Sequence, residues 1–331
     1  MIDLFEKLIT GNIEKVEIVK VLNHEDYKFE FTRYKERVSE TEYVDYLFRL
    51  SNLNESDIKN IDLKTHHIYY KDLLNNLDLY KEELHELEKS LTPRLFKEQI
   101  STALKGLPDD IILPHLNFIF TIGIGQSFGY VYQNCMHFDF LQLAKDMSIN
   151  DFCSSIAHEV HHVGVSTIAE QIHLNKMPLE TLFYFYFSGE GLAVKYCNNA
   201  EGVLSKSIYE EAKNQGLDTF TWKHLNNDFY NTMAHFRKTV SDIRNNNIKS
   251  AKELNILMSD YWLNTYTEEQ NKTDIPKLKH SRIYSFGNDI WGIIHDCFGK
   301  NAVFETLKNP NKFPMIFNKS LDKLGYEQFK I

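Results

Sequence analysis

The chain has 331 residues, 43% of them hydrophobic, which is enough for one large or two ordinary globular domains with a substantial core. Its 46 acidic residues outnumber its 37 lysines and arginines, and the net charge of −9 argues against a nucleic-acid partner. The start, Met1–Lys7, lacks the pattern of a signal peptide, and the most apolar stretch, Leu182–Phe187, is too short to span a membrane.

The first third of the chain has a helical pattern. Residues 1–105 alternate charged positions with aromatic or aliphatic ones, which predicts an N-terminal helical region. One helix is expected where Ser39 and Glu42 have the spacing of a capping box in front of an apolar run. The segment Gly106–Pro108 marks a break. We therefore expect a second region over residues 106–331.

This second region begins with a pattern typical of strands. Residues 117–122 and 128–139 are rich in aromatic and β-branched side chains, so a small sheet is predicted within 117–140. Helical patterns follow, including 220–246 and 284–298 in the C-terminal part. The predicted fold class is mainly α (α+β), with helical N- and C-terminal regions.

A helix is predicted over 149–163, directly after the sheet. Ser148 and Asp151 have capping-box spacing at its start, and Gly164 is its expected end. Apolar residues at helical spacing form one stripe: Ile149, Phe152, Cys153, Ile156, Val160 and Val163. His158 and His162 lie almost opposite this stripe. The segment that they bound, His158–His162, reads HEVHH and fits the metal-binding pattern H-E-x-x-H.

The spacing of this motif suits a catalytic zinc ion. His158 and His162 are one helical turn apart, so both can direct a ring nitrogen at one Zn²⁺, and Glu159 can reach a water molecule as general base. His161 is expected to be a bystander. The metzincin continuation is excluded, because Val165 stands where it requires glycine. The alternative interpretation of the motif is a solvated histidine face.

A third protein ligand is expected, since catalytic zinc usually has three. The strongest candidate is Glu190, because a helix predicted over 188–197 places its carboxylate on an apolar face, where it needs a partner. The alternative is a glutamate at a helix N-terminus that interacts with the helix dipole. Glu170 and His173 are weaker candidates for the ligand.

These segments resemble a known class of enzymes. The HEVHH segment followed by Gly189–Ala193, which reads GEGLA, resembles the gluzincins, zinc peptidases with a downstream glutamate ligand. The EGLA part is similar to the E-G-F-A of zinc aminopeptidases. The resemblance implies that Glu190 and the two outer histidines of HEVHH hold zinc. Further on, Tyr284–Gly287 is similar to their Y-x-K-G stretch, whose tyrosine stabilises the transition state.

The resemblance covers residues 110–320, and the wider layout is most similar to uncharacterised bacterial families described as zinc-dependent peptidases. Two features differ: the lysine of Y-x-K-G is missing, and Val194 stands where the thermolysin pattern has an aspartate. The resemblance implies Tyr284 as the donor to the oxyanion. His235 and His280 are the alternatives.

The sequence thus predicts a zinc metallopeptidase that hydrolyses peptide bonds through a zinc-bound water activated by Glu159. Its partner would be a peptide or protein substrate, with no nucleic acid and no membrane. The cysteines lack C-x-x-C spacing and indicate reduced thiols in a cytoplasmic protein: Cys135, Cys153, Cys197 and Cys297. The alternatives are a metal-binding protein without peptidase activity and a helical interaction protein with an accidental motif.

Overall fold

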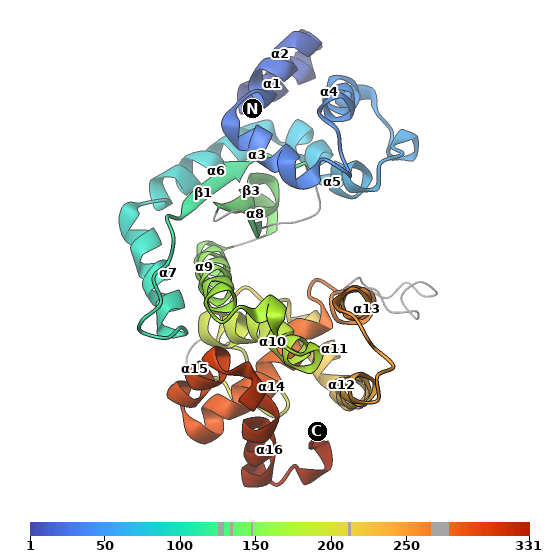
Figure 1. Cartoon of the computed structure of the whole chain (residues 1–331). Helices are drawn as coiled ribbons and strands as arrows, with labels where there is room; N and C mark the ends of the chain where they lie inside the picture. Colours follow the sequence, from blue (N-terminus) through green and yellow to red (C-terminus); the bar gives the residue numbers. More distant parts are fainter. Residues whose placement is uncertain (125–128, 133–134, 147, 211–212, 266–277) are drawn as a thin grey trace. The chain divides into compact units, whose positions relative to one another are not determined.

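A computed structural model describes the chain except residues 125–128, 133–134, 147, 211–212 and 266–277. Helices dominate and one small sheet interrupts them, so the predicted mainly α class is confirmed (Figure 1). Two compact units form: residues 1–96 with 114–152, and residues 97–113 with 153–331. The boundary predicted at residue 105 stays a prediction. None of the described helices combines the length and apolar character needed to cross a membrane.

The first unit is a set of helices around an apolar core. Its helices are α1 (Ile2–Thr10), α2 (Lys15–Leu22), α3 (Glu25–Tyr34), α4 (Glu40–Arg49), α5 (Ile61–Asn75), α6 (Leu77–Ser90) and α8 (Phe140–Asp146). The predicted start of α4 is confirmed, because the Ser39 side chain accepts a hydrogen bond of 3.2 Å from the backbone N–H of Glu42. Helix α7 (Pro93–Lys105) begins in this unit and ends in the second.

The predicted sheet is also confirmed, and it belongs to the first unit. Its strands are β1 (Asn117–Thr121), β2 (Gly129–Tyr132) and β3 (Cys135–Asp139), in the order β1-β3-β2. Strand β3 runs parallel to β1 and antiparallel to β2. The register pairs the last residues of β1 and β3, Thr121 and Asp139. Polar side chains gather at this end of the sheet.

A buried glutamate joins α3 to the end of β1. The Glu30 side chain is 1% exposed, and its carboxylate accepts hydrogen bonds from the Thr121 hydroxyl at 2.8 Å and the Ile124 backbone N–H at 2.9 Å. The His137 Nε2 atom lies 3.4 Å from the same carboxylate. A carboxylate buried with these partners fixes the chain that leaves β1.

A buried aspartate fixes the same chain segment from β3. The Asp139 carboxylate accepts backbone N–H bonds from Gly123 at 3.1 Å and Leu141 at 3.0 Å, and a side-chain bond from Gln142 at 2.7 Å. The His66 Nε2 atom lies 2.9 Å from Asp139 Oδ2, the oxygen that also accepts from Gln142. Burial raises the pKa of Asp139, but His66 and the hydrogen bonds outweigh it and hold the pKa below its ordinary value.

The helix that carries HEVHH is α9 (Ile149–Gln171). Its predicted capping box is confirmed: Ser148 Oγ accepts from the Asp151 N–H at 3.2 Å, and the Asp151 carboxylate accepts from the Ser148 N–H at 3.4 Å. The predicted end at Gly164 is wrong, because the helix continues for seven residues to Gln171. A side chain at Gly164 would collide with Leu107, so this glycine permits close packing.

The next helix, α10 (Leu179–Ala193), continues as a π-helix over Val194–Asn198. The sequence predicts this helix over 188–197, but it begins earlier, at Leu179. The aromatic residues before Ser188 belong to the same helix, and most of them are buried. The π-turn adds a residue to one turn of the helix and changes which side chains share a face.

The second unit also contains α11 (Thr219–Asn227), α12 (Phe229–Arg244), α13 (Ala251–Leu257), α14 (Arg282–Phe298), α15 (Lys300–Lys308) and α16 (Phe313–Leu324). The predicted helical stretch 220–246 is divided at Asp228. Helix α10 packs along α14 (Figure 1), and a side chain built at Gly287 would lie 2.9 Å from the Cα atom of Gly191. These glycines let the two helices touch backbone to backbone.

Candidate active site

Helix α9 and helix α10 bring two histidines and one glutamate together. The rings of His158 and His162 lie 4.6 Å apart, with their planes at 81°. The Glu190 Oε2 atom is 3.0 Å from His158 Nε2 and 3.3 Å from His162 Nε2. One ligand atom from each residue lies within 4.8 Å of the others. The structure thus gathers the three residues that the sequence predicts as metal ligands.

The chemistry and spacing of this cluster fit zinc. Tetrahedral zinc binds imidazole nitrogen and carboxylate oxygen at about 2.0–2.2 Å, which separates neighbouring ligand atoms by roughly 3.3–3.5 Å. The two nitrogen-to-oxygen distances, 3.0 and 3.3 Å, need little adjustment to reach this value. Among the residues that the structure describes, this is the one group of three or more metal-binding side chains.

The charges of Glu190 and His162 shift each other's pKa values. Burial alone would lower the pKa of His162, but the charge of Glu190 and its hydrogen bond raise this pKa to about 9. Burial would raise the pKa of Glu190, and the two histidines instead hold it well below its ordinary value. A proton on His162 and a metal ion would therefore compete for the same electron pair.

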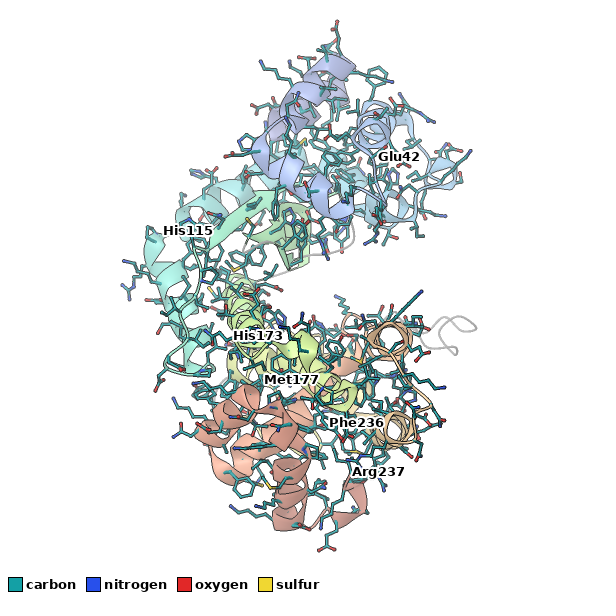
Figure 2. The ribbon with its side chains drawn as sticks, viewed as in Figure 1. Glu42, His115, His173, Met177, Phe236 and Arg237 are labelled. Carbon is teal, nitrogen blue, oxygen red and sulfur yellow. The ribbon has the colours of Figure 1, made fainter. Side chains whose placement is uncertain are left out.

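The position of Glu190 in α10 excludes one of its two interpretations. It lies in the last regular turn before the π-helix, far from the start of the helix at Leu179. The interpretation of Glu190 as a residue that interacts with the positive end of the helix dipole is therefore wrong, since that end is at the N-terminus. Glu170 and His173 are exposed and lie outside the cluster; His173 follows the end of α9 (Figure 2).

The general-base candidate, Glu159, has an intermediate exposure on the same helix as the two histidines. Its negative charge contributes to raising the pKa of His162 and that of Tyr284. The Glu159 carboxylate therefore interacts electrostatically with both side chains.

Tyr284, on the first turn of α14, lies beside the cluster. Its ring stacks on His158 with the centroids 5.8 Å apart and the planes at 14°. Burial, with the charges of Glu190 and Glu159, raises the pKa of the Tyr284 hydroxyl well above its ordinary value. The hydroxyl therefore keeps its proton at neutral pH and is able to donate a hydrogen bond.

His280 also lies beside Tyr284, with the two ring centroids 5.4 Å apart. Its Nε2 atom accepts a hydrogen bond of 3.0 Å from the backbone N–H of Asp218. Burial and the charge of His158 lower the pKa of His280 to about 4. A neutral imidazole that accepts at Nε2 carries its proton on Nδ1, so His280 is a second donor near the cluster.

Two other histidines that the sequence singled out have different surroundings. His235 stacks on Tyr261 with the ring centroids 3.7 Å apart, and burial with the charges of Lys238 and Arg282 lowers its pKa. His161 is fully buried, and its Nε2 atom bonds the carbonyl oxygen of Gly106 at 3.1 Å. Neither histidine belongs to the metal-binding cluster.

The sequence did not reveal the partner on the other ring nitrogen of His158. The Asn198 Oδ1 atom lies 2.7 Å from His158 Nδ1, and Asn198 Nδ2 donates to the Gln215 carbonyl oxygen at 2.7 Å. Val194, where the thermolysin pattern has an aspartate, offers no polar side-chain atom. The two consecutive asparagines that begin at Asn198 can be seen in the sequence, but they usually indicate the end of a helix and not a partner for a histidine.

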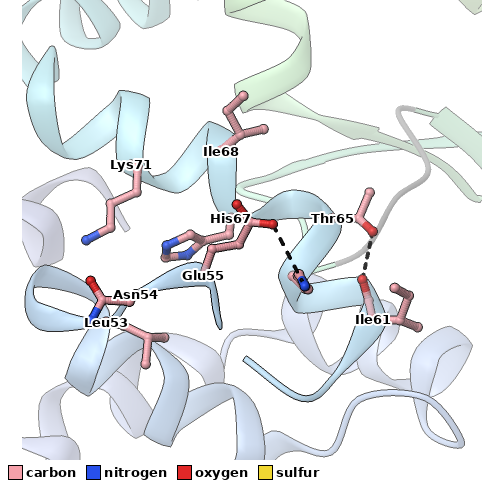
Figure 3. A pocket seen from close by; sticks show the side chains of 9 residues that line it. Leu53, Asn54, Glu55, Ile61, Thr65, His67, Ile68 and Lys71 are labelled. Atoms are coloured by element: carbon pink, nitrogen blue, oxygen red, sulfur yellow. Dashed lines mark hydrogen bonds and ion pairs between the residues drawn. The ribbon is translucent and has the colours of Figure 1, made fainter. Parts of the chain in front are cut away.

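A separate cavity of about 660 Å³ lies within the first unit, beside α5 (Figure 3). Its lining mixes apolar and charged side chains: Leu53, Asn54, Glu55, Ile61, Lys64, Thr65, His67, Ile68 and Lys71. Lys64 pairs with Glu55 at 4.0 Å, and Lys71 donates to the Leu50 carbonyl oxygen at 2.9 Å. Its lining includes none of the residues that the sequence predicts for catalysis.

Comparison with known proteins agrees with the metal-binding cluster. The model of the family described as "Putative zinc dependent peptidase (DUF5700)" matches residues 18–325. The chain belongs to this family. The matched range includes all candidate site residues on α9, α10 and α14. No curated protein and no solved structure matches the chain.

Proposed function

We propose that this chain is a zinc-dependent peptidase of the gluzincin type, with His158, His162 and Glu190 as the metal ligands and Glu159 as the general base. The observation that carries the proposal is the approach of two imidazole nitrogens to one carboxylate oxygen, at 3.0 and 3.3 Å. The family description supports the same chemistry. The substrate would be a peptide or a protein.

Peptide hydrolysis adds water across the C–N bond, and Glu159 would carry the proton between the two reacting atoms. A bound zinc ion supplies Lewis-acid chemistry, which acidifies water and polarises a carbonyl oxygen. The Glu159 carboxylate would take one proton as the water oxygen attacks the carbonyl carbon. It would then deliver that proton to the amine nitrogen as the C–N bond breaks, so the carboxylate is regenerated.

Tyr284 would stabilise the oxyanion that forms on the carbonyl. Its raised pKa keeps the hydroxyl protonated, and its ring stacks on His158. A donor placed where negative charge develops is worth more in the transition state than in the ground state. The Nδ1–H of His280, next to Tyr284, would be a second donor or would orient the substrate.

The decisive variant is Glu159→Gln, assayed for zinc content and for cleavage of a peptide library. We expect zinc to stay bound while kcat falls by about 10² or more, because the amide cannot accept the proton. Glu170→Gln is the matched control, since Glu170 lies on the same helix but is exposed and outside the cluster. Unchanged turnover in Glu159→Gln would refute the hydrolytic mechanism.

The same measurements on the parent protein separate the alternative functions. Stoichiometric zinc with no cleavage of any peptide would favour a metal-binding protein without peptidase activity. Absence of zinc binding would favour an interaction protein whose H-E-x-x-H is accidental. Cleavage that stops on chelation and returns with zinc would support the peptidase.

A further inference from the structure

Asn198 lies at the end of the π-helix that follows α10, and its side chain is directed into the interior. The residue is 3% exposed. Its Oδ1 atom is 2.7 Å from Nδ1 of His158, the ring nitrogen opposite the one that faces Glu190. Asn198 is therefore positioned to act on the metal site through an imidazole and not through the metal itself.

The hydrogen bonds of Asn198 determine the orientation of its amide. Asn198 Nδ2 donates to the backbone carbonyl oxygen of Gln215 at 2.7 Å, and a carbonyl oxygen can only accept. The other amide atom, which faces His158, is therefore the oxygen. Because this oxygen also only accepts, Nδ1 of His158 carries a proton. Nε2, which faces the Glu190 carboxylate at 3.0 Å, is then the nitrogen that would bind a metal in place of a proton.

Gln215 is itself fixed by two further hydrogen bonds. Its backbone N–H donates to the Asn198 carbonyl oxygen at 3.0 Å. Its side-chain oxygen accepts from the Ser154 hydroxyl at 3.1 Å, and Ser154 lies one turn before His158 on α9. Three hydrogen bonds therefore link Ser154 to Gln215, Gln215 to Asn198 and Asn198 to His158, and the backbone of α9 joins Ser154 to His158 and closes the ring. A ring of this kind restrains the amide and the imidazole together.

The π-turn explains how α10 supplies both a ligand and its support. Residues eight apart on a regular α-helix differ by about 80° around the axis. A π-turn takes up one extra residue, so the angle between Glu190 and Asn198 falls to about 20°. Both side chains then face His158. The irregular turn has a function in this arrangement: it aligns the two contacts on the same imidazole.

We propose that Asn198 is a positioning residue of the metal site, which fixes the tautomer and the ring orientation of His158. The proposal rests on the metal centre of the proposed function, and the Gln215–Ser154 pair extends it by fixing the amide. Partners of this kind typically contribute 10- to 100-fold to metal affinity. A merely structural asparagine would affect folding stability and leave the affinity of the folded site unchanged.

The first test is the zinc dissociation constant, measured by competition with a chromogenic chelator. Asn198→Ala should weaken zinc binding 10- to 100-fold. Asn198→Asp separates the two roles of the side chain: it keeps an acceptor for His158 but loses the donor to Gln215. We expect Asn198→Asp to melt at a lower temperature and to hold zinc within about threefold of the parent.

Asn199→Ala is the matched control. Asn199 is the next residue, equally buried at 3% exposure, and its side-chain oxygen accepts from the backbone N–H groups of Ile208 and Tyr209. Its removal should lower the melting temperature without changing zinc affinity. Equal loss of zinc affinity in Asn198→Ala, Asn198→Asp and Asn199→Ala would overturn the proposal, because loop stability would then explain all three.

The second test does not depend on metal or turnover. Nitrogen NMR shifts of His158 in zinc-free protein should show a proton on Nδ1 in the parent, and a share of Asn198→Ala molecules should lack it, because it is Asn198 that accepts at that nitrogen. A parent whose Nδ1 carries no proton overturns the proposal. A parent that binds zinc and behaves as expected in both tests, yet cleaves no peptide, refutes the peptidase function and leaves the positioning role standing. Absence of zinc binding overturns both.

Discussion

Both units place carboxylates against histidines, but the donors around those carboxylates differ. In the first unit, Asp139 contacts one histidine and also accepts two backbone N–H bonds and a glutamine side chain. Glu30 likewise combines one histidine with a hydroxyl and a backbone N–H. In the second unit, two histidines approach a single oxygen of Glu190.

The difference teaches how a candidate metal site can be told from a structural carboxylate. A buried carboxylate saturated by backbone donors is already compensated and has little capacity left for a cation. Glu190 depends instead on imidazoles, which are donors only when protonated and metal ligands when neutral. The number of convergent imidazoles distinguishes the two regions, and so does exposure, because the Glu190 side chain is 23% exposed and those of Asp139 and Glu30 are buried.

The largest expected effect comes from removal of a ligand. Glu190→Ala should lower zinc affinity by more than about 100-fold, beyond the loss typical of a supporting residue, because two histidines alone hold zinc poorly. His158→Ala and His162→Ala should behave alike. Chelator competition measures the affinity. Full zinc occupancy in Glu190→Ala would remove Glu190 from the site and direct attention to another acid such as Glu170.

Removal of the Asp139 carboxylate should have the opposite result: a loss of stability without a loss of zinc affinity. Asp139→Ala leaves the N–H groups of Gly123 and Leu141 and the His66 ring without their acceptor, and should reduce the free energy of unfolding by about 3–5 kcal/mol. Zinc affinity of the folded protein should not change. Chemical denaturation and a zinc titration measure the two quantities. A loss of zinc affinity in folded Asp139→Ala would contradict the expectation that zinc binding does not depend on Asp139.

The oxyanion donor is tested by Tyr284→Phe, which removes one hydroxyl and keeps the ring that stacks on His158. If Tyr284 donates to the oxyanion, kcat falls by about 10² to 10³, and KM changes little because the bond forms mainly in the transition state. Zinc content should stay constant. Steady-state kinetics on a cleavable peptide decides, and a rate within about threefold of the parent would transfer the role to His280.

Lowering the pH should affect the two regions differently, and this is the smallest of the expected effects. Zinc binding requires neutral His158 and His162, so zinc affinity should fall by about tenfold or more as the pH drops from 7.5 to 6. The folded-state pKa of Asp139 is lowered, so its stabilising contribution is present above its unfolded pKa of about 3.9 and is lost only as pH falls below that value. Zinc titrations and unfolding curves across this range test both statements. Zinc affinity independent of pH would contradict histidine ligation.

Several features of the fold follow from local patterns in the sequence. The starts of α4 and α9 are set by Ser39 and Ser148, because a capping bond joins residues only three apart. The sheet within 117–140 follows from its aromatic and β-branched residues. Gly164 and the start of α10 were predicted wrongly, because both depend on what packs against the helix.

The sequence by itself determined that two histidines share a helix face, since four residues make about one turn of any α-helix. It also indicated Glu190, through a carboxylate on an apolar face. Only the tertiary structure decided that Glu190 meets both rings, because this requires α9 and α10 to pack together. The structure likewise revealed Asn198, since a π-turn and contacts between residues 40 positions apart leave no periodic signal in the chain.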